Sequence, residues 1–594
     1  MLQRFFILLF ILGWHSGFAQ NNEAQAESYY KKGEFKKALI IYENLAKEKP
    51  YNSNYIYKLI DIHQQLEQYK DAENIIVQRL AKRQNPAMLV ALGYNFQLID
   101  SLNRANKLYD EAIAFVDEKP NYIYSIAQKF EDYSLLDQAI KVYEKGKILT
   151  PDRNYTIQLA RIYGDQGNIE QMFANYIDYV NFKPNNLNNI KRAITDFISE
   201  NKDNENNVFL RRLLLKKIQQ EPKPYWYDML SWLYIQEKAY NKSFIQEKAL
   251  YKRNPESLDR IIELAETARK DNDDDTAKSI FNYILETTQD RATALIAHQY
   301  ILEIDTKTAD EKTLKLIDET YKNLFLEFGK SQLTIPLQLA YGKFLAFNLK
   351  DTKTATNFLK ESLELNISYY RKAKIKLLLA DILVLQEKFN EALIFYSQIQ
   401  TELKNSTIAQ EARFKVAKTS YYKGDFDWAE SQLKILKSST SQLIANDALD
   451  LKLLISDNKF EDSLQTSLKL YAKADLYAFQ NKTDEAISLL DKILEEHKGE
   501  SIIDQTLYQQ AKLFEKKKQY SKAEANYLEI IKDYRDGILA DDAHYHLAEL
   551  YNTPLANPEE AKQLYEKIIF EYQDSIYFIE ARRKFRMLRG DSIN

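Results

Sequence analysis

Two histidines near the carboxyl-terminal end are the first candidates for chemistry. His544 and His546 lie close to Asp541, Asp542 and Glu549, and imidazole and carboxylate groups are the ligands that zinc prefers in proteins. Residues two apart on a helix point to different faces, however, so the two imidazoles would not converge on one ion. We therefore expect ordinary histidines on a helix surface and no metal site.

A second candidate is the acidic run at residues 271–275, which resembles the beginning of a calcium-binding loop. Such a loop needs glycine at its sixth position and a bidentate glutamate at its twelfth. Thr276 and Asn282 occupy these positions. We therefore expect the run to form a solvated turn and to cap the following helix.

Signatures of catalysis are missing from the rest of the sequence. There is no glycine-rich phosphate loop, no zinc-protease histidine pair and no serine in a glycine-flanked elbow. The chain has 6 histidines and no cysteine, which excludes disulfides, thiolate catalysis and thiolate metal sites. We expect no enzyme activity and no cofactor.

The composition indicates many amphipathic helices. Only 13 glycines and 11 prolines interrupt 594 residues, of which 45% are hydrophobic and 28% charged. A chain of this length is either several domains or one long repeat array, and this balance of residues favours the array. The net charge of -4 offers no positive excess to neutralise phosphates, so nucleic acid is not an expected partner.

The first residues have the features of a signal peptide, which we place at residues 1–19. Arg4 begins the segment, an apolar stretch runs over residues 5–14, and Gly17 and Ala19 are small residues of the kind found before a cleavage site. The apolar stretch is too short to span a bilayer. We expect a periplasmic or secreted protein with no membrane span, associated with an outer membrane, if at all, through a partner.

An internal repeat runs along the chain. A small residue is followed four residues later by an aromatic or large apolar residue, at intervals of 33 or 34 at first and 37 or 38 later. The position of the small residue is held by Ala38, Ala72, Ala105, Ala139, Met172, Ser243, Ala277, Ala355, Ala392, Ala429, Ala486, Ala523 and Ala561. We expect each unit to be two antiparallel helices, with this residue where they cross most closely.

The flanking residues resemble the tetratricopeptide repeat family. The first unit has Tyr29, Gly33, Ala38, Tyr42 and Pro50 at the offsets of that family's 34-residue unit. The resemblance implies an all-α fold, a right-handed superhelical solenoid of about fifteen helix pairs. Prolines 50, 151, 184 and 255 are expected to end the second helix of their units.

Changes in the interval predict the domain organisation. An amino-terminal array of about 34-residue units is expected over residues 20–290, an irregular helical connector over 291–330, a second array of 37–38-residue units over 331–589, and a tail at 590–594. A degenerate unit is expected at about residues 187–222. Ser463 lies only 23 residues before Ala486, which predicts one long helix running from Phe460 through Phe479.

The last sixth of the chain, residues 501–589, looks like the repeats of outer-membrane assembly lipoproteins and of periplasmic Tol-Pal-associated proteins. This resemblance implies work in the cell envelope. The resemblance to the repeat family also implies a groove lined by the first helix of each unit, at offsets of 18, 15, 11 and 8 before the small residue. The candidate groove residues are Asn54, Tyr57, Asp61, Gln64, Tyr94, Gln97, Asn121, Tyr124, Gln128, Asn154 and Arg161.

Tyrosines and amides at these positions could hold an extended chain by ring contacts and hydrogen bonds. The leading hypothesis is therefore an exported scaffold or adaptor that binds protein partners in the cell envelope through this groove. The alternative is a glycan-binding repeat protein of a nutrient-uptake or cell-wall system, because the 42 tyrosines and 29 phenylalanines also suit stacking on sugars.

Overall fold

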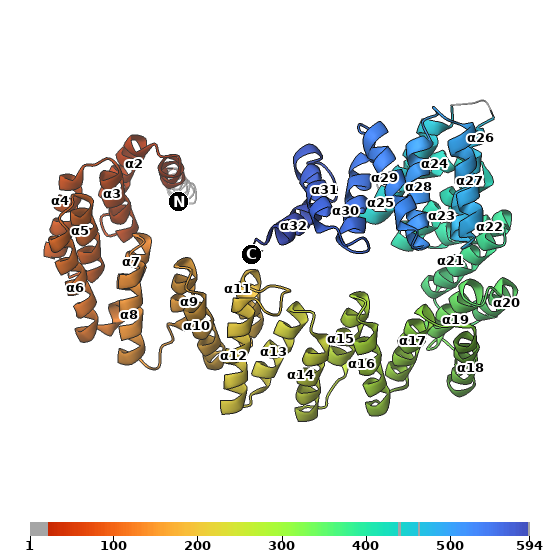
Figure 1. Cartoon of the computed structure of the whole chain (residues 1–594). Coiled ribbons are helices and arrows are strands. Elements are labelled where there is room, and N and C mark those ends of the chain that lie inside the picture. The colour runs from red at the N-terminus through yellow and green to blue at the C-terminus, as the bar shows by residue number, and fades with distance from the viewer. Residues whose placement is uncertain (1–21, 83, 437–440, 461–463, 592–594) are drawn as a thin grey trace, which may run out of the picture. The chain divides into compact units, whose positions relative to one another are not determined.

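The computed structural model describes residues 22–82, 84–436, 441–460 and 464–591. The predicted signal peptide, Ser463 and residues 592–594 of the predicted tail lie outside these ranges. All regular elements in the described ranges are helices, and helices joined by short turns pack against each other as antiparallel pairs (Figure 1). The all-α fold predicted from the repeat is confirmed, whereas the superhelical hand and the number of pairs stay predictions.

The chain divides into two compact units, with the boundary between Glu237 and Lys238. In the first unit residues 22–31 are helical. The further elements are α2 (Phe35–Glu48), α3 (Ser53–Gln65), α4 (Tyr69–Lys82), α5 (Pro86–Leu98), α6 (Leu102–Glu118), η1 (Pro120–Tyr122), α7 (Ile123–Asp132), α8 (Leu136–Leu149), α9 (Thr156–Asp165), α10 (Ile169–Phe182), η2 (Pro184–Asn186), α11 (Leu187–Ile194), η3 (Thr195–Phe197), α12 (Glu205–Gln220) and α13 (Pro224–Gln236).

The second unit continues the succession of helices. Its elements are α14 (Tyr240–Arg253), α15 (Asp259–Lys270), α16 (Asp274–Thr287), α17 (Arg291–Lys307), α18 (Glu311–Phe328), α19 (Ile335–Phe347), α20 (Thr352–Leu363), α21 (Tyr369–Leu385), α22 (Phe389–Glu402), α23 (Thr407–Lys423), α24 (Phe426–Leu436), α25 (Gln442–Asn458), α26 (Thr466–Phe479), α27 (Thr483–Glu496), α28 (Ile503–Lys516), α29 (Tyr520–Asp533), α30 (Ala540–Asn552), α31 (Pro558–Glu571) and α32 (Phe578–Arg589).

The crossing points of the helix pairs are where the repeat predicts them. All thirteen small-residue positions, from Ala38 to Ala561, are at most 1% exposed. A longer side chain there would separate the helices, which costs about 1–3 kcal/mol in a packed core. The helices before Pro50, Pro151, Pro184 and Pro255 each end two residues earlier, since the residue before a proline disfavours helical geometry.

The predicted degenerate unit is present as α11 and α12, with α11 reduced to eight residues and followed by a 3-10 turn. The predicted connector contains two regular helices, α17 and α18. The boundaries predicted at residues 290 and 330 mark changes in repeat length, and they stay predictions. The boundary between the two compact units lies elsewhere, after residue 237.

The long helix predicted from Phe460 through Phe479 is wrong. Helix α25 ends at Asn458, and α26 begins only after Gln465, whose backbone is left-handed with φ 56°. Helix α25 packs on α24, whereas α26 pairs with α27. An additional helix has therefore been inserted between two pairs, which explains the irregular interval before Ala486.

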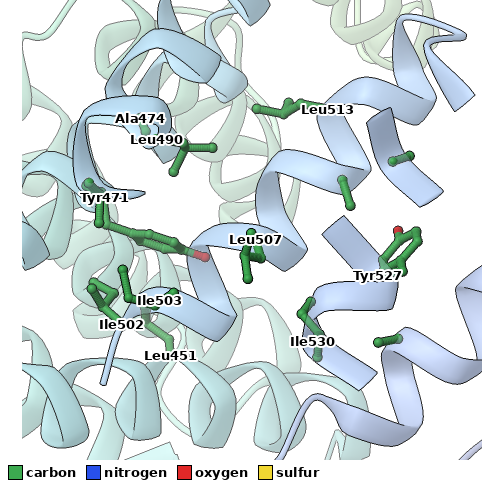
Figure 2. Packing of buried hydrophobic residues seen from close by; sticks show 14 of the residues in the cluster. Leu451, Tyr471, Ala474, Leu490, Ile502, Ile503, Leu507, Leu513, Tyr527 and Ile530 are labelled. Atoms are coloured by element: carbon green, nitrogen blue, oxygen red, sulfur yellow. The ribbon is translucent and has the colours of Figure 1, made fainter. Parts of the chain in front are cut away.

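Side chains of the inserted helix also meet residues at the beginning of α28. Figure 2 shows Leu451 of α25 beside Ile502 and Ile503 at the beginning of α28, in one cluster of buried apolar side chains. Asn458, which is fully buried, donates to Oε1 of Gln505 at 2.8 Å. The insertion is thus held by burial and by polar contacts, and it is part of the core of the second unit.

Candidate functional site

A cleft with a volume of about 1300 Å³ lies in the first unit. It follows the first helix of four successive pairs: residues 22–31, α3, α5 and α7. With roughly 8–10 Å between the axes of packed helices, four first helices in a row give the cleft a length of about 24–30 Å. An extended chain of about seven to nine residues has this length. We call this surface the amino-terminal cleft.

The sequence of these helices places one face in the core and the other in the cleft. In α3, Ile56, Leu59 and Ile60 are buried, while Tyr57 and Asp61 line the cleft. Asn52 caps α3, because its side chain accepts a hydrogen bond from the backbone amide of Asn54 at 3.0 Å. The cap and the apolar face together fix which side chains of α3 can reach a ligand.

A buried lysine forms the floor of the cleft. Lys129 of α7 has a side chain that is only 9% exposed, and its Nζ lies 2.8 Å from Oδ2 of Asp132. The same ammonium group lies 4.1 Å from the ring centroid of Tyr57 and 5.2 Å from that of Tyr133. A buried cation needs such partners, because an unpaired charge is costly to desolvate.

A tyrosine pair and a carboxylate complete the floor. Tyr94 and Tyr133 stack with ring centroids 4.1 Å apart and planes at 13°, and the Tyr133 hydroxyl donates to Oδ1 of Asp61 at 3.2 Å. Burial raises the pKa of Asp61, while the charge of Lys129 and the hydrogen bond from Tyr133 oppose that rise. Burial and the nearby Asp61 raise the pKa of Tyr133, so its hydroxyl stays protonated.

Residues 22–31 form one wall of the cleft, and a lysine of α3 neutralises the carboxylate of Glu27 in this wall. Lys58 Nζ lies 3.1 Å from Oε2 of Glu27 and 3.7 Å from the ring centroid of Tyr30. The Tyr42 hydroxyl donates to Glu27 at 2.9 Å. Burial would raise the pKa of Glu27, but the hydrogen bonds from Tyr42 and Lys58 outweigh it and the pKa is lowered.

These contacts leave aromatic rings, amides and a few charged side chains such as Lys82 as the groups that can meet a ligand. Asn54, Gln65 and Gln128 line the cleft and are exposed, and Tyr57 and Tyr94 are partly exposed. Such a surface can hydrogen-bond a peptide backbone while packing rings against its side chains. Histidine and cysteine do not occur among the lining residues that the structure describes.

The structure brings together six of the eleven candidate groove residues. Asn54, Tyr57, Asp61, Gln64, Tyr94 and Gln128 line the amino-terminal cleft, and Gln97, Asn121, Tyr124, Asn154 and Arg161 do not. The offsets counted back from the small residue therefore predict the cleft in its first repeats only.

Three of the residues outside the cleft have other contacts. Gln97 accepts a hydrogen bond from the hydroxyl of Tyr109 at 2.9 Å. Asn154 accepts from both the backbone amide and the hydroxyl of Thr156, at the beginning of α9. The ring of Tyr124 lies 5.1 Å from that of Tyr155. Asn121 and Arg161 are exposed elsewhere on the first unit.

Sequence reasoning missed Lys58, Lys129 and Tyr133. Tyr133 follows the last residue of α7 and lies two residues beyond the final offset considered, so the offsets do not reach it. A lysine within an apolar helix is normally expected at the surface. No pattern in the sequence shows that Lys129 is buried between aromatic rings, because its partners come from α3 and from the end of α7.

The two early candidates for metal chemistry have structural roles. His544 is 2% exposed, and its Nδ1 lies 2.7 Å from the carbonyl oxygen of Ala540, so the expectation of a surface histidine is wrong there. His546 faces Tyr508 on another side of α30. Among the described residues, no group of three or more histidine, aspartate or glutamate side chains could hold a metal ion.

The acidic run lies in the turn between α15 and α16, as expected. Asp273 caps α16 by accepting from the backbone amide of Thr276 at 3.2 Å. Asp274 pairs with Lys307 at 2.7 Å. The run therefore stabilises a helix end and an inter-repeat contact.

Helix α26 of the second unit packs on α23, and its side chains reach the carboxyl ends of α19 and α21. Lys473 Nζ lies 2.8 Å from Oε2 of Glu387, and the ring of Phe479 lies 6.2 Å from those of both Phe347 and Tyr422. None of the helices in the described ranges is both long and apolar enough to cross a membrane.

The tetratricopeptide repeat family matches residues 505–537 and 542–575, which contain most of α28 to α31. None of the curated proteins compared with the chain matches it. Similar solved structures include Naa15/Naa10 bound to HypK-THB, with 12% identity, 96% of each chain covered and a TM-score of 0.29. A second is the APC/C hetero-tetramer Cut9-Hcn1, with 12% identity, 96% of each chain covered and a TM-score of 0.23. The chain thus carries tetratricopeptide repeats at residues 505–537 and 542–575, and its regular elements in the described ranges are helices.

Proposed function

We propose that the protein is an exported scaffold of the cell envelope that binds an extended segment of a partner protein in the amino-terminal cleft. The observation that carries this proposal is the cleft itself: about 1300 Å³ of open space over a floor of neutralised charges. Because Lys129 and Lys58 are already paired with carboxylates, affinity would come mainly from ring contacts and backbone hydrogen bonds. No enzyme activity is proposed.

The ring of Tyr94 should contribute most to binding, because it is partly exposed and rests on Tyr133. We expect Tyr94→Ala to weaken binding of the partner by about 2 kcal/mol, roughly thirtyfold in Kd, as for an aromatic anchor at an interface. The measurement is quantitative mass spectrometry of proteins that co-purify with the full-length chain, followed by titration of the partner so identified.

The matched control is Tyr369→Ala, which removes an exposed tyrosine of α21 outside the cleft. The same partner should be recovered with this variant as with the unaltered protein. Equal loss with both variants, or no loss with Tyr94→Ala, would show that the partner does not use the cleft. A glycan recovered in place of a protein would favour the alternative function.

Export is proposed from the apolar segment at the beginning of the chain. We expect the mature protein to begin at Gln20, after removal of residues 1–19. Mass spectrometry of the native amino terminus measures this directly. A chain that retains Met1 in cells that express the protein normally would remove the basis for a place in the envelope.

A further inference from the structure

The last repeats of the second unit carry an aromatic surface on their first helices. It consists of Tyr508 of α28, Asp542, Tyr545 and His546 of α30, and Tyr577 just before α32, and we call it the carboxyl-terminal aromatic surface. All five residues are partly exposed. Tyr545 and Tyr577 stack with centroids 4.1 Å apart and planes at 11°, and His546 lies 5.8 Å from the ring of Tyr508.

This surface repeats the arrangement at the floor of the amino-terminal cleft. In both places one member of a stacked tyrosine pair donates its hydroxyl to an aspartate of another first helix: Tyr133 to Asp61 at 3.2 Å, and Tyr577 to Asp542 at 3.1 Å. Tyr508 also donates to Asp542, at 3.5 Å. The two surfaces belong to different units and share no residue.

The balance of charge differs between the two surfaces. Burial, together with the charges of Asp541 and of Asp450 on α25, raises the pKa of Asp542 to about 6. Asp542 accepts hydrogen bonds from Tyr508 and Tyr577 and, in the described part of the chain, forms no ion pair. In the cleft, by contrast, the charge of Lys129 opposes the rise that burial causes in the pKa of Asp61.

Two lysines border the carboxyl-terminal aromatic surface, and neither pairs with Asp542. Lys584 Nζ lies 2.6 Å from both carboxylate oxygens of Glu549 and 5.8 Å from the ring centroid of Tyr545. Lys512 Nζ lies 3.3 Å from Nδ1 of His546, and burial and this lysine keep that imidazole neutral by lowering its pKa to about 4. Asp542 therefore offers a carboxylate beside stacked tyrosine rings, and both properties favour a cation.

We propose that the carboxyl-terminal aromatic surface is a second binding site, which takes a basic segment of a partner protein by placing an arginine or lysine side chain over the tyrosine rings and next to Asp542. A guanidinium group suits this site because it can stack on a ring and bond a carboxylate at once. The protein then has two binding surfaces of different specificity, which would raise the avidity for a partner that carries both segments.

The test uses the full-length protein and a fluorescein-labelled nonapeptide of alternating arginine and glycine, with binding followed by fluorescence anisotropy at low salt. Asp542→Asn keeps an acceptor for the hydroxyls of Tyr577 and Tyr508 but removes the charge. We expect this variant to bind the peptide about tenfold more weakly, and Tyr545→Ala to lose a similar factor. The peptide with glutamate in place of arginine should not bind.

The matched control is Asp152→Asn, the same substitution at an exposed aspartate of the first unit that does not line the amino-terminal cleft. This variant should leave affinity for the arginine peptide unchanged. Equal binding of the arginine and glutamate peptides would overturn the proposal. So would unchanged affinity in Asp542→Asn, an equal loss in Asp152→Asn, or no binding at millimolar peptide. None of these results bears on the partner of the amino-terminal cleft, because no variant alters a residue of that cleft.

Discussion

Replacing Arg211 by methionine is expected to destabilise the first unit by about 3–5 kcal/mol, the range for breaking a buried ion pair. Nη1 of Arg211 donates to both carboxylate oxygens of Glu237, at 3.0 and 2.9 Å, and the Glu237 side chain is fully buried. Nη2 also donates to the carbonyl oxygen of Lys202 at 2.8 Å. Without the guanidinium group, this buried carboxylate loses two charge-assisted hydrogen bonds.

The measurement is chemical denaturation of the full-length protein followed by circular dichroism, with the transition of the first unit assigned by limited proteolysis. Arg212→Met is the matched control, because Arg212 is exposed on the same helix, and such surface changes usually stay within about 0.5 kcal/mol. Adding Glu237→Gln to Arg211→Met should restore part of the loss. Equal stability of the two single variants would contradict a structural role for the ion pair.

The second large effect is a pair of opposite pH dependences in the carboxyl-terminal repeats. Burial raises the pKa of Asp542 to about 6, so between pH 4 and 6 the folded protein holds a proton that the unfolded chain has released. Acidification through this range therefore stabilises the fold. Burial lowers the pKa of His546 to about 4, so the unfolded chain binds the proton first and the same acidification destabilises the fold.

We expect Asp542→Asn to be more stable than the unaltered protein at pH 7, by roughly 2–3 kcal/mol, and to lose stability as the pH falls to 5. His546→Gln should behave in the opposite way, with stability that rises on acidification. Thermal unfolding between pH 5 and 7 measures both profiles. Parallel profiles for the two variants would contradict these protonation states.

Local packing made most of the fold predictable from the sequence. A residue such as Ala139 or Ala523 must be small because two helices cross there, and this requirement recurs at intervals of 33 or 34 residues at first and of 37 or 38 later. Proline residues such as Pro151 mark helix ends for an equally local reason. The insertion of α25 was not predictable, because its position depends on distant partners such as Gln505.

The cleft could be predicted only in part for the same reason. Offsets within one helix find Tyr57 and Asp61, since both lie on the outward face of α3. They do not reveal that Tyr133 reaches Asp61 from 72 residues away, or that Gln97 is already bonded to Tyr109. Contacts between repeats decide which outward residues are free to bind.

The role of the amino-terminal cleft is tested most directly by site-specific photo-cross-linking in cells. A photoreactive amino acid is placed at Asn54 or Gln128, which line the cleft, and at the exposed positions Ile40 and Ile148 of α2 and α8, which do not. Binding in the cleft predicts one and the same protein cross-linked from both cleft positions and from neither control. Equal cross-linking from all four positions, or none from the cleft, would contradict it.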